Sequence, residues 1–66
     1  MKPNELKAEL QRKNLNYQDA AKALGISVVA FQRKVNAITE FKSSEIGALR
    51  DLLELSPERV TEIFFN

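Results

Sequence analysis

The fold of this chain is decided by the stretch NYQDAAKALGISVVAFQRKVN, which comprises residues 16–36. Asn16 is a favourable N-cap, because its side-chain oxygen can accept a hydrogen bond from the first free amides of a helix. Asp19 complements the positive end of the helix dipole. Gly25 can take the left-handed conformation that ends a helix. These signals predict a short helix over residues 17–24.

A second short helix follows after only three residues. Ser27 can cap it, and it is expected from about residue 28 to residue 36, with Phe31 and Val35 as its i, i+4 apolar pair. The turn Gly-Ile-Ser is short and contains glycine. Such a turn holds two helices steeply crossed, which allows the second helix to enter the major groove of DNA.

Helical periodicity continues on both sides of this stretch. Before it, residues 4–14 place Leu6 and Leu10 on one face, and Glu9 is expected away from that face. After it, residues 37–42 have no helical period and are expected to form a loop with Phe41 tucked beneath it.

Two further helices complete the chain. One is expected over residues 44–53 with Ser43 as its cap, and the last begins at Ser56-Pro57-Glu58, which combines a cap, a first-turn proline and a first-turn acid. The side chains expected to face the core are Ile46, Leu49, Leu52, Leu53, Val60, Ile63 and Phe64. The sequence therefore predicts one all-α domain of five helices over residues 1–66.

Composition excludes several classes of function. The 66 residues include neither Cys nor His, so disulfides, thiolate metal sites and the commonest general base are ruled out. No nucleophile–base pair or glycine-rich phosphate loop is visible, and we expect no enzyme, no cofactor, no metal and no small-molecule substrate. No apolar run approaches the roughly 20 residues that span a bilayer, so no membrane association is expected.

Charge is unevenly distributed along the chain. Residues 1–41 carry seven basic and four acidic side chains, a balance of +3, whereas residues 42–66 carry three basic and five acidic side chains, a balance of −2. This asymmetry suits a module that touches phosphates with one face, although scattered surface charge would give the same counts.

The same residues resemble the helix-turn-helix of the Cro/C1-type (XRE) phage repressors, and of small phage or mobile-element regulators within that family. The matching residues are Leu15, Asn16, Ala21, Leu24, Gly25, Ile26, Ser27, Phe31, Val35 and Asn36. The resemblance implies a five-helix lambda-repressor-like domain with its helix-turn-helix at about residues 17–36. It implies a cytoplasmic transcription regulator, in a bacterial cell or phage-infected host, that binds operator sites in double-stranded DNA.

The resemblance also implies roles for individual side chains of a recognition helix at residues 28–36. At about 100° per residue, Val29, Gln32 and Arg33 fall on the arc opposite the apolar pair. Gln32 suits adenine, Arg33 suits guanine or a phosphate, and Val29 suits a thymine methyl group. Val28 is also a contact position but lies near the core arc. Phosphate contacts are implied for Asn16, Tyr17, Asn36 and Lys42.

Other interpretations remain open for several of these residues. Gln32 and Arg33 can belong to an ordinary solvated face, Asn16 can act as a cap only, and Tyr17 can stack on the first helix. The family usually has polar residues where this chain has Val28 and Val29. Those valines suit an alternative function as a protein-interaction module, an antirepressor or adaptor that keeps the helix-turn-helix as a scaffold.

Two adjacent phenylalanines end the last helix. One helix cannot bury both Phe64 and Phe65 on the same side. If Phe64 faces the core, Phe65 is left exposed, in a dimer contact, or folded back against the first helix. A two-fold homodimer through the C-terminal helix would place two recognition helices about 34 Å apart, one turn of DNA.

Overall fold

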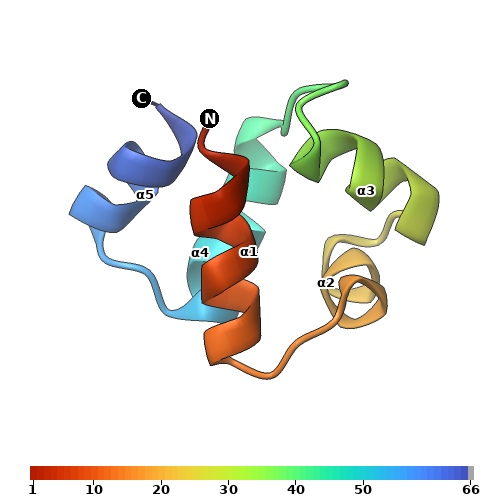
Figure 1. The fold of residues 1–66 in the computed structure, drawn as a ribbon, viewed down its shortest axis with the longest axis horizontal. Helices are drawn as coiled ribbons and strands as arrows, with labels where there is room; N and C mark the ends of the chain where they lie inside the picture. Colours follow the sequence, from red (N-terminus) through yellow and green to blue (C-terminus); the bar gives the residue numbers. More distant parts are fainter. Residues whose placement is uncertain (66) are drawn as a thin grey trace.

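The computed structural model describes residues 1–65, and within that range it contains five α-helices and no β-strand (Figure 1). In chain order they are α1 (Pro3–Arg12), α2 (Tyr17–Leu24), α3 (Val28–Val35), α4 (Ser43–Leu53) and α5 (Pro57–Phe64). The predicted all-α class with five helices is therefore confirmed. Each predicted helix end lies within two residues of the observed one. No helix in the described range is long and apolar enough to cross a bilayer.

All five helices contribute to one core. In Figure 1, α5 lies on one side of α1 and the pair formed by α2 and α3 lies on the other, with α4 behind α1. The contacts between α2 and α4, α1 and α3, and α4 and α5 close the domain. The buried apolar side chains of the helices are Leu6, Leu10, Ala20, Ala21, Phe31, Val35, Leu49, Leu53, Ile63 and Phe64. Alternation at three and four residues thus marked the inward faces correctly.

Four of the helices end in the same way. The residues Asn14, Gly25, Ala37 and Glu54 all adopt a positive φ, between 53° and 72°. In each case the N–H of this residue donates to the carbonyl three positions earlier, and the next N–H donates to the carbonyl five positions before it. This is the Schellman arrangement, which satisfies carbonyl groups at the end of a helix. Only Gly25 adopts it without a steric cost from a Cβ atom.

Helix beginnings follow the predicted caps with one exception. In three cases the side-chain oxygen accepts a hydrogen bond from the N–H three residues later; these caps are Asn16, Ser27 and Ser56. The prediction that Ser43 caps the fourth helix is wrong, because Ser43 is already the first helical residue. Lys42 occupies the cap position, and its N–H donates to the Glu45 carboxylate at 2.8 Å.

An ionic cluster joins α1 to α5, and the sequence did not predict it. Glu9, expected away from the core face, is buried with 4% of its surface exposed. Its carboxylate accepts hydrogen bonds from Arg12 and Arg59, and Arg59 also pairs with Glu5 at 2.9 Å. Burial by itself would raise the pKa of the Glu9 carboxyl, but the bonds from Arg59 and Arg12 outweigh it and hold that pKa below its ordinary value.

Candidate nucleic-acid interface

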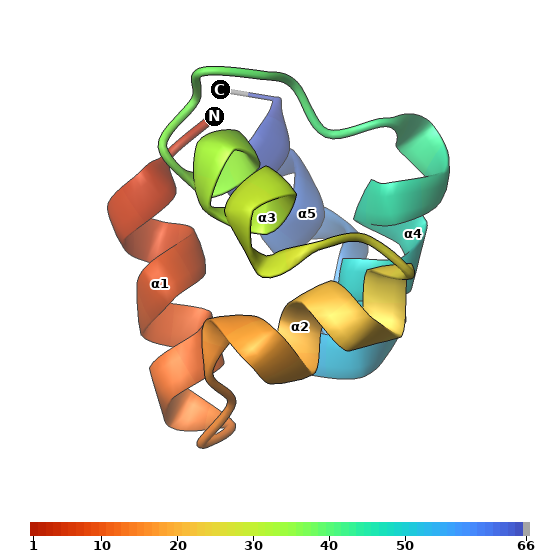
Figure 2. The ribbon, with the colours of Figure 1, turned by 90° about the vertical axis from the view of Figure 1, so that its right-hand side faces the viewer.

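The two helices of the deciding stretch cross steeply. Only Gly25, Ile26 and Ser27 separate α2 from α3, and the two helices pack against each other. Figure 1 looks nearly along α2 while α3 runs across the view, and Figure 2, turned by 90°, shows the reverse. The left-handed Gly25 and the cap at Ser27 hold the turn between them.

Aromatic packing fixes how α3 is rotated about its own axis. Phe31 and Val35 are fully buried. The Phe31 ring meets Tyr17 edge-on with centroids 5.4 Å apart, and it meets Phe41 edge-on at 5.9 Å. Since α2 and the loop after α3 both pack on Phe31, the inner side of α3 is fixed and its opposite side faces outward.

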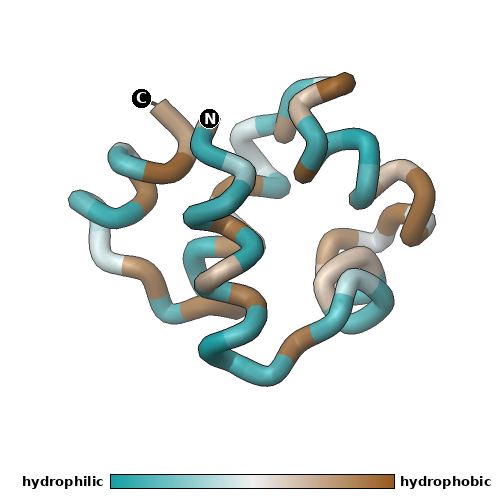
Figure 3. Tube along the Cα trace, viewed as in Figure 1, coloured by the Kyte–Doolittle hydropathy of each residue, from teal (hydrophilic) through white to brown (hydrophobic). Residues whose placement is uncertain are grey.

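That outer side of α3 is uncovered by the protein's own chain. Val29, Gln32 and Arg33 are exposed along the helix, and Asn36 is exposed at its C-cap. In Figure 2 no other segment lies in front of α3. Figure 3 shows a helix that is hydrophobic where it begins and hydrophilic along its middle. This outer α3 face, defined by Val29, Gln32, Arg33 and Asn36, is where the sequence places base contacts.

The two adjacent valines at the start of α3 lie in different environments. Val28 is half-buried and packs against the core, whereas Val29 has 63% of its surface exposed. The local apolar character of the outer α3 face therefore comes from Val29 alone.

The flanking residues assigned to phosphates lie in different environments. The Asn16 side-chain oxygen accepts a hydrogen bond from the Asp19 N–H at 2.8 Å. The NH₂ group of the same side chain is the part that can donate to a phosphate. Tyr17 is half-buried, and its ring packs edge-on against Phe31 of α3. Lys42 is exposed at the start of α4.

Positive charge is concentrated around this face. Residues 20–39 contain Lys22, Arg33 and Lys34 and no acidic residue. Within the part of the chain that the structure describes, Lys22 and Arg33 have no carboxylate partner, whereas the charge of Lys42 helps to lower the pKa of the Glu45 carboxyl without forming an ion pair with it. Lys22 was not among the predicted residues; it lines a shallow groove between α2 and the beginning of α3. The exposed cations Lys22, Arg33 and Lys42 favour an anionic partner.

Lys34, by contrast, is turned away from this face. Its ammonium group donates to the Glu45 carboxylate at 2.9 Å and to the Glu40 carbonyl at 3.1 Å, and only 12% of its side chain is exposed. Burial would raise the pKa of Glu45, but hydrogen bonds from the Lys42 N–H and from Lys34 hold it below its ordinary value. The pair ties α3 to α4, and no local spacing in the sequence indicates it.

No family model, curated protein or solved structure matches this chain. Among the described residues, no group of three or more His, Cys, Asp or Glu side chains is placed to hold a metal ion.

Proposed function

We propose that this chain is a sequence-specific DNA-binding transcription regulator. In this proposal α2, the turn and α3 form a helix-turn-helix of the Cro/C1 type, and α3 is the recognition helix in the major groove. The observation that carries the proposal is the outer α3 face. It is exposed and polar except for Val29, while the inner side of the same helix is anchored by fully buried Phe31 and Val35.

The chemistry of this face suits base edges. Gln32 can donate to and accept from adenine, and Arg33 can make two parallel hydrogen bonds to guanine. Val29 offers methyl groups and no polar atom, so its favourable partner is the methyl group of thymine. The three side chains lie within five residues of one another, so one docking of α3 presents them to neighbouring base pairs.

Side chains around the helix pair suit the phosphate backbone. Arg33, Lys22 and Lys42 bring positive charge, the Asn16 amide and the Tyr17 hydroxyl are donors beside the start of α2, and Asn36 lies at the end of α3. Because so few phosphates are touched by one domain, binding of a single copy is expected to be weak and strongly dependent on salt. A palindromic site bound by two copies would raise the affinity.

The test is a selection from random DNA duplexes with the purified protein, followed by titration of the winning site at two salt concentrations. The proposal expects a recurring sequence, with affinity that falls as salt rises. A pool that shows no enriched sequence, or binding that does not change with salt, would contradict it.

One observation favours a second candidate, a protein-interaction module. Val29 is a large apolar side chain with 63% of its surface exposed in the middle of the proposed contact face. A protein partner would bury it, as expected for an adaptor or antirepressor. Chemical-shift mapping separates the two candidates, because a DNA duplex perturbs α3 under the first and leaves it unchanged under the second.

A further inference from the structure

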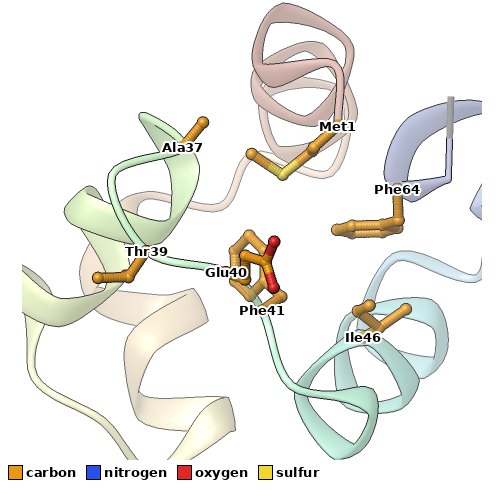
Figure 4. A pocket seen from close by; sticks show the side chains of 7 residues that line it. All are labelled: Met1, Ala37, Thr39, Glu40, Phe41, Ile46 and Phe64. Atoms are coloured by element: carbon orange, nitrogen blue, oxygen red, sulfur yellow. The ribbon is translucent and has the colours of Figure 1, made fainter.

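The two adjacent phenylalanines at the end of the last helix lie in different environments. Phe64 has 9% of its surface exposed, whereas Phe65 has 67% exposed, so the alternative in which Phe65 folds back against the first helix is wrong. Phe64 also lines a pocket that has a volume of about 200 Å³ (Figure 4). The start of the chain, the loop after α3, α4 and the end of α5 all contribute to it, and its lining residues are Met1, Ala37, Thr39, Glu40, Phe41, Ile46 and Phe64.

The inner side of this pocket is apolar. Phe64 is buried, and Met1, Phe41 and Ile46 are half-buried. The rings of Phe41 and Phe64 meet edge-on with their centroids 5.7 Å apart. An apolar cavity of about 150 Å³ accepts a benzene ring. The pocket therefore has room for one six-membered ring and a short substituent.

The rim of the pocket carries one ionised side chain, that of Glu40. Glu40 is the only acidic or basic residue among the lining residues, and it is exposed. Within the described residues its carboxylate has no hydrogen-bond or ion-pair partner. In Figure 4 this carboxylate lies in the middle of the lining side chains, and the side chains of Met1 and Phe64 point toward the same place. The pocket thus combines an apolar floor with a negative charge at its rim.

The cation nearest to these rings, Lys34, leaves the Glu40 carboxylate free. Its ammonium group pairs with the Glu45 carboxylate at 2.9 Å and donates to the backbone carbonyl of Glu40 at 3.1 Å. The same ammonium group lies over the Phe41 ring, 5.9 Å from the centroid, so Phe64 is the ring left for a ligand. A carboxylate and the face of an aromatic ring both attract a cation and disfavour an anion.

We propose that this pocket binds a small organic ammonium ion, a protonated amine joined to an aromatic ring or to an apolar group of similar size. The apolar group would lie against Phe41, Ile46 and Phe64, and the ammonium group would pair with Glu40. An exposed ion pair contributes little to affinity, so the ring supplies most of the binding and the carboxylate selects the charge of the ligand. None of the lining residues belongs to the outer α3 face, so this inference does not depend on the proposed function.

The test is an NMR titration at pH 7 with three probes that share one ring: benzylamine, which is protonated, benzyl alcohol, which is neutral, and benzoate, which is negative. Backbone amide shifts of the pocket residues report binding. Benzylamine is expected to bind with a dissociation constant on the order of 1 mM, as suits so small a ligand. Benzyl alcohol is expected to bind about fivefold more weakly, because it lacks the charge, and benzoate more weakly still.

Three variants locate the source of this preference. Glu40→Gln keeps the size of the side chain and removes its charge, so it is expected to erase the difference between benzylamine and benzyl alcohol. Glu58→Gln is the matched control, because Glu58 is an exposed acid of α5 outside the pocket. Thr39→Trp places a ring at the pocket and is expected to abolish the binding of all three probes. Circular dichroism checks that every variant folds.

Several results would overturn the inference. Equal affinity for benzylamine and benzyl alcohol in the unchanged chain, or tighter binding of benzoate, would show that the pocket does not select an ammonium ion. Shifts that persist in Thr39→Trp, or that occur only outside the pocket, would show that the probes bind elsewhere. If the pocket shifts change with protein concentration when no probe is present, a second copy of the chain occupies the pocket in place of a small ligand.

Discussion

Arg59 Nε donates a hydrogen bond to Glu9 Oε2 at 2.7 Å, so a side chain of α5 neutralises a buried carboxylate of α1 that lies 50 residues earlier. The pair fastens the last helix to the first. Because the pKa of Glu9 is lower in the folded chain than its ordinary value, the folded state binds fewer protons than the unfolded state in the acidic range. The stabilisation is therefore fully present above the ordinary pKa of 4.5 and is lost as pH falls through the lower folded value.

Glu9→Gln is expected to lower the free energy of unfolding at pH 7 by about 1–3 kcal/mol, because a buried charge-assisted hydrogen bond is lost. It should also flatten the loss of stability below about pH 4.5, leaving the part due to Glu45 and Glu54, whose pKa values are lowered as well. Urea unfolding monitored between pH 3 and pH 7 measures both effects.

Glu62→Gln is the matched control for that experiment. Glu62 pairs with the same Arg59, but half of its side chain is exposed to solvent, where an ion pair contributes little. Equal losses in the two variants would show that the burial of Glu9 is not the source of the effect.

Ala37→Gly is expected to stabilise the domain by about 0.5–1 kcal/mol. Ala37 has a φ of 61°, a conformation that is costly for a residue with a Cβ atom, and glycine removes that cost at the expense of a more flexible unfolded chain.

Gly25→Ala tests the same backbone cost, but here the substitution adds a Cβ atom and is expected to lower stability. Gly25 has a φ of 72°, and a Cβ atom there would meet nothing within 4 Å, so any destabilisation comes from the backbone alone. We expect a loss of roughly 1 kcal/mol, measured by thermal unfolding. A gain or no change at Gly25 would contradict the argument for both positions.

Arg33→Ala is expected to weaken binding to the selected DNA site by about 1–3 kcal/mol and to relax the preference at one base pair, if Arg33 reads a base. Gln32→Ala should do the same at a neighbouring pair. Exposed residues of the same type elsewhere serve as controls, Arg50→Ala on α4 and Gln11→Ala on α1. If the control variants weaken binding as much as the α3 variants do, the outer α3 face is not the DNA contact.

Lys42 and Lys34 are expected to behave in opposite ways. Lys42→Met should reduce the slope of log affinity against log salt by about 1, the signature of one lost phosphate contact, and lower stability only slightly, because Lys42 acts on the Glu45 carboxylate without an ion pair. Lys34→Met should leave that slope unchanged and lower stability by about 1–3 kcal/mol, because the buried Glu45 carboxylate loses its ion-pair partner and keeps only the hydrogen bond from the Lys42 N–H. Lys13→Met is the control for stability, since the Glu54 carboxylate that Lys13 pairs with is mostly exposed.

Most of the helical architecture is predictable from the sequence because its signals are local. Caps at Asn16, Ser27 and Ser56 act on amides three residues away, and the left-handed end at Gly25 depends on a residue without a Cβ atom. Apolar spacing of three and four marks the buried side of every helix. The helix begins at Ser43, one residue before the predicted start, and the Glu45 carboxylate accepts a hydrogen bond from the N–H of the cap residue Lys42.

The candidate site is only half predictable in this way. The sequence places Gln32 and Arg33 opposite Phe31 and Val35 on one helix, but it does not show that no other segment covers them. Val28 packs against the core while its neighbour Val29 is exposed, and Lys34 forms an ion pair with Glu45. Both facts depend on residues that lie far away in the sequence.

The amino-acid sequence by itself determined where the helices begin and end and which side of each is apolar, since these properties depend on residues within about one helical turn of each other. Tertiary structure alone decided that Glu9 contacts Arg59, that Lys34 contacts Glu45, and that Met1 and Phe64 line one pocket with the loop after α3 (Figure 4). These contacts join residues up to 50 positions apart in the sequence, and they form only because the helices pack against one core.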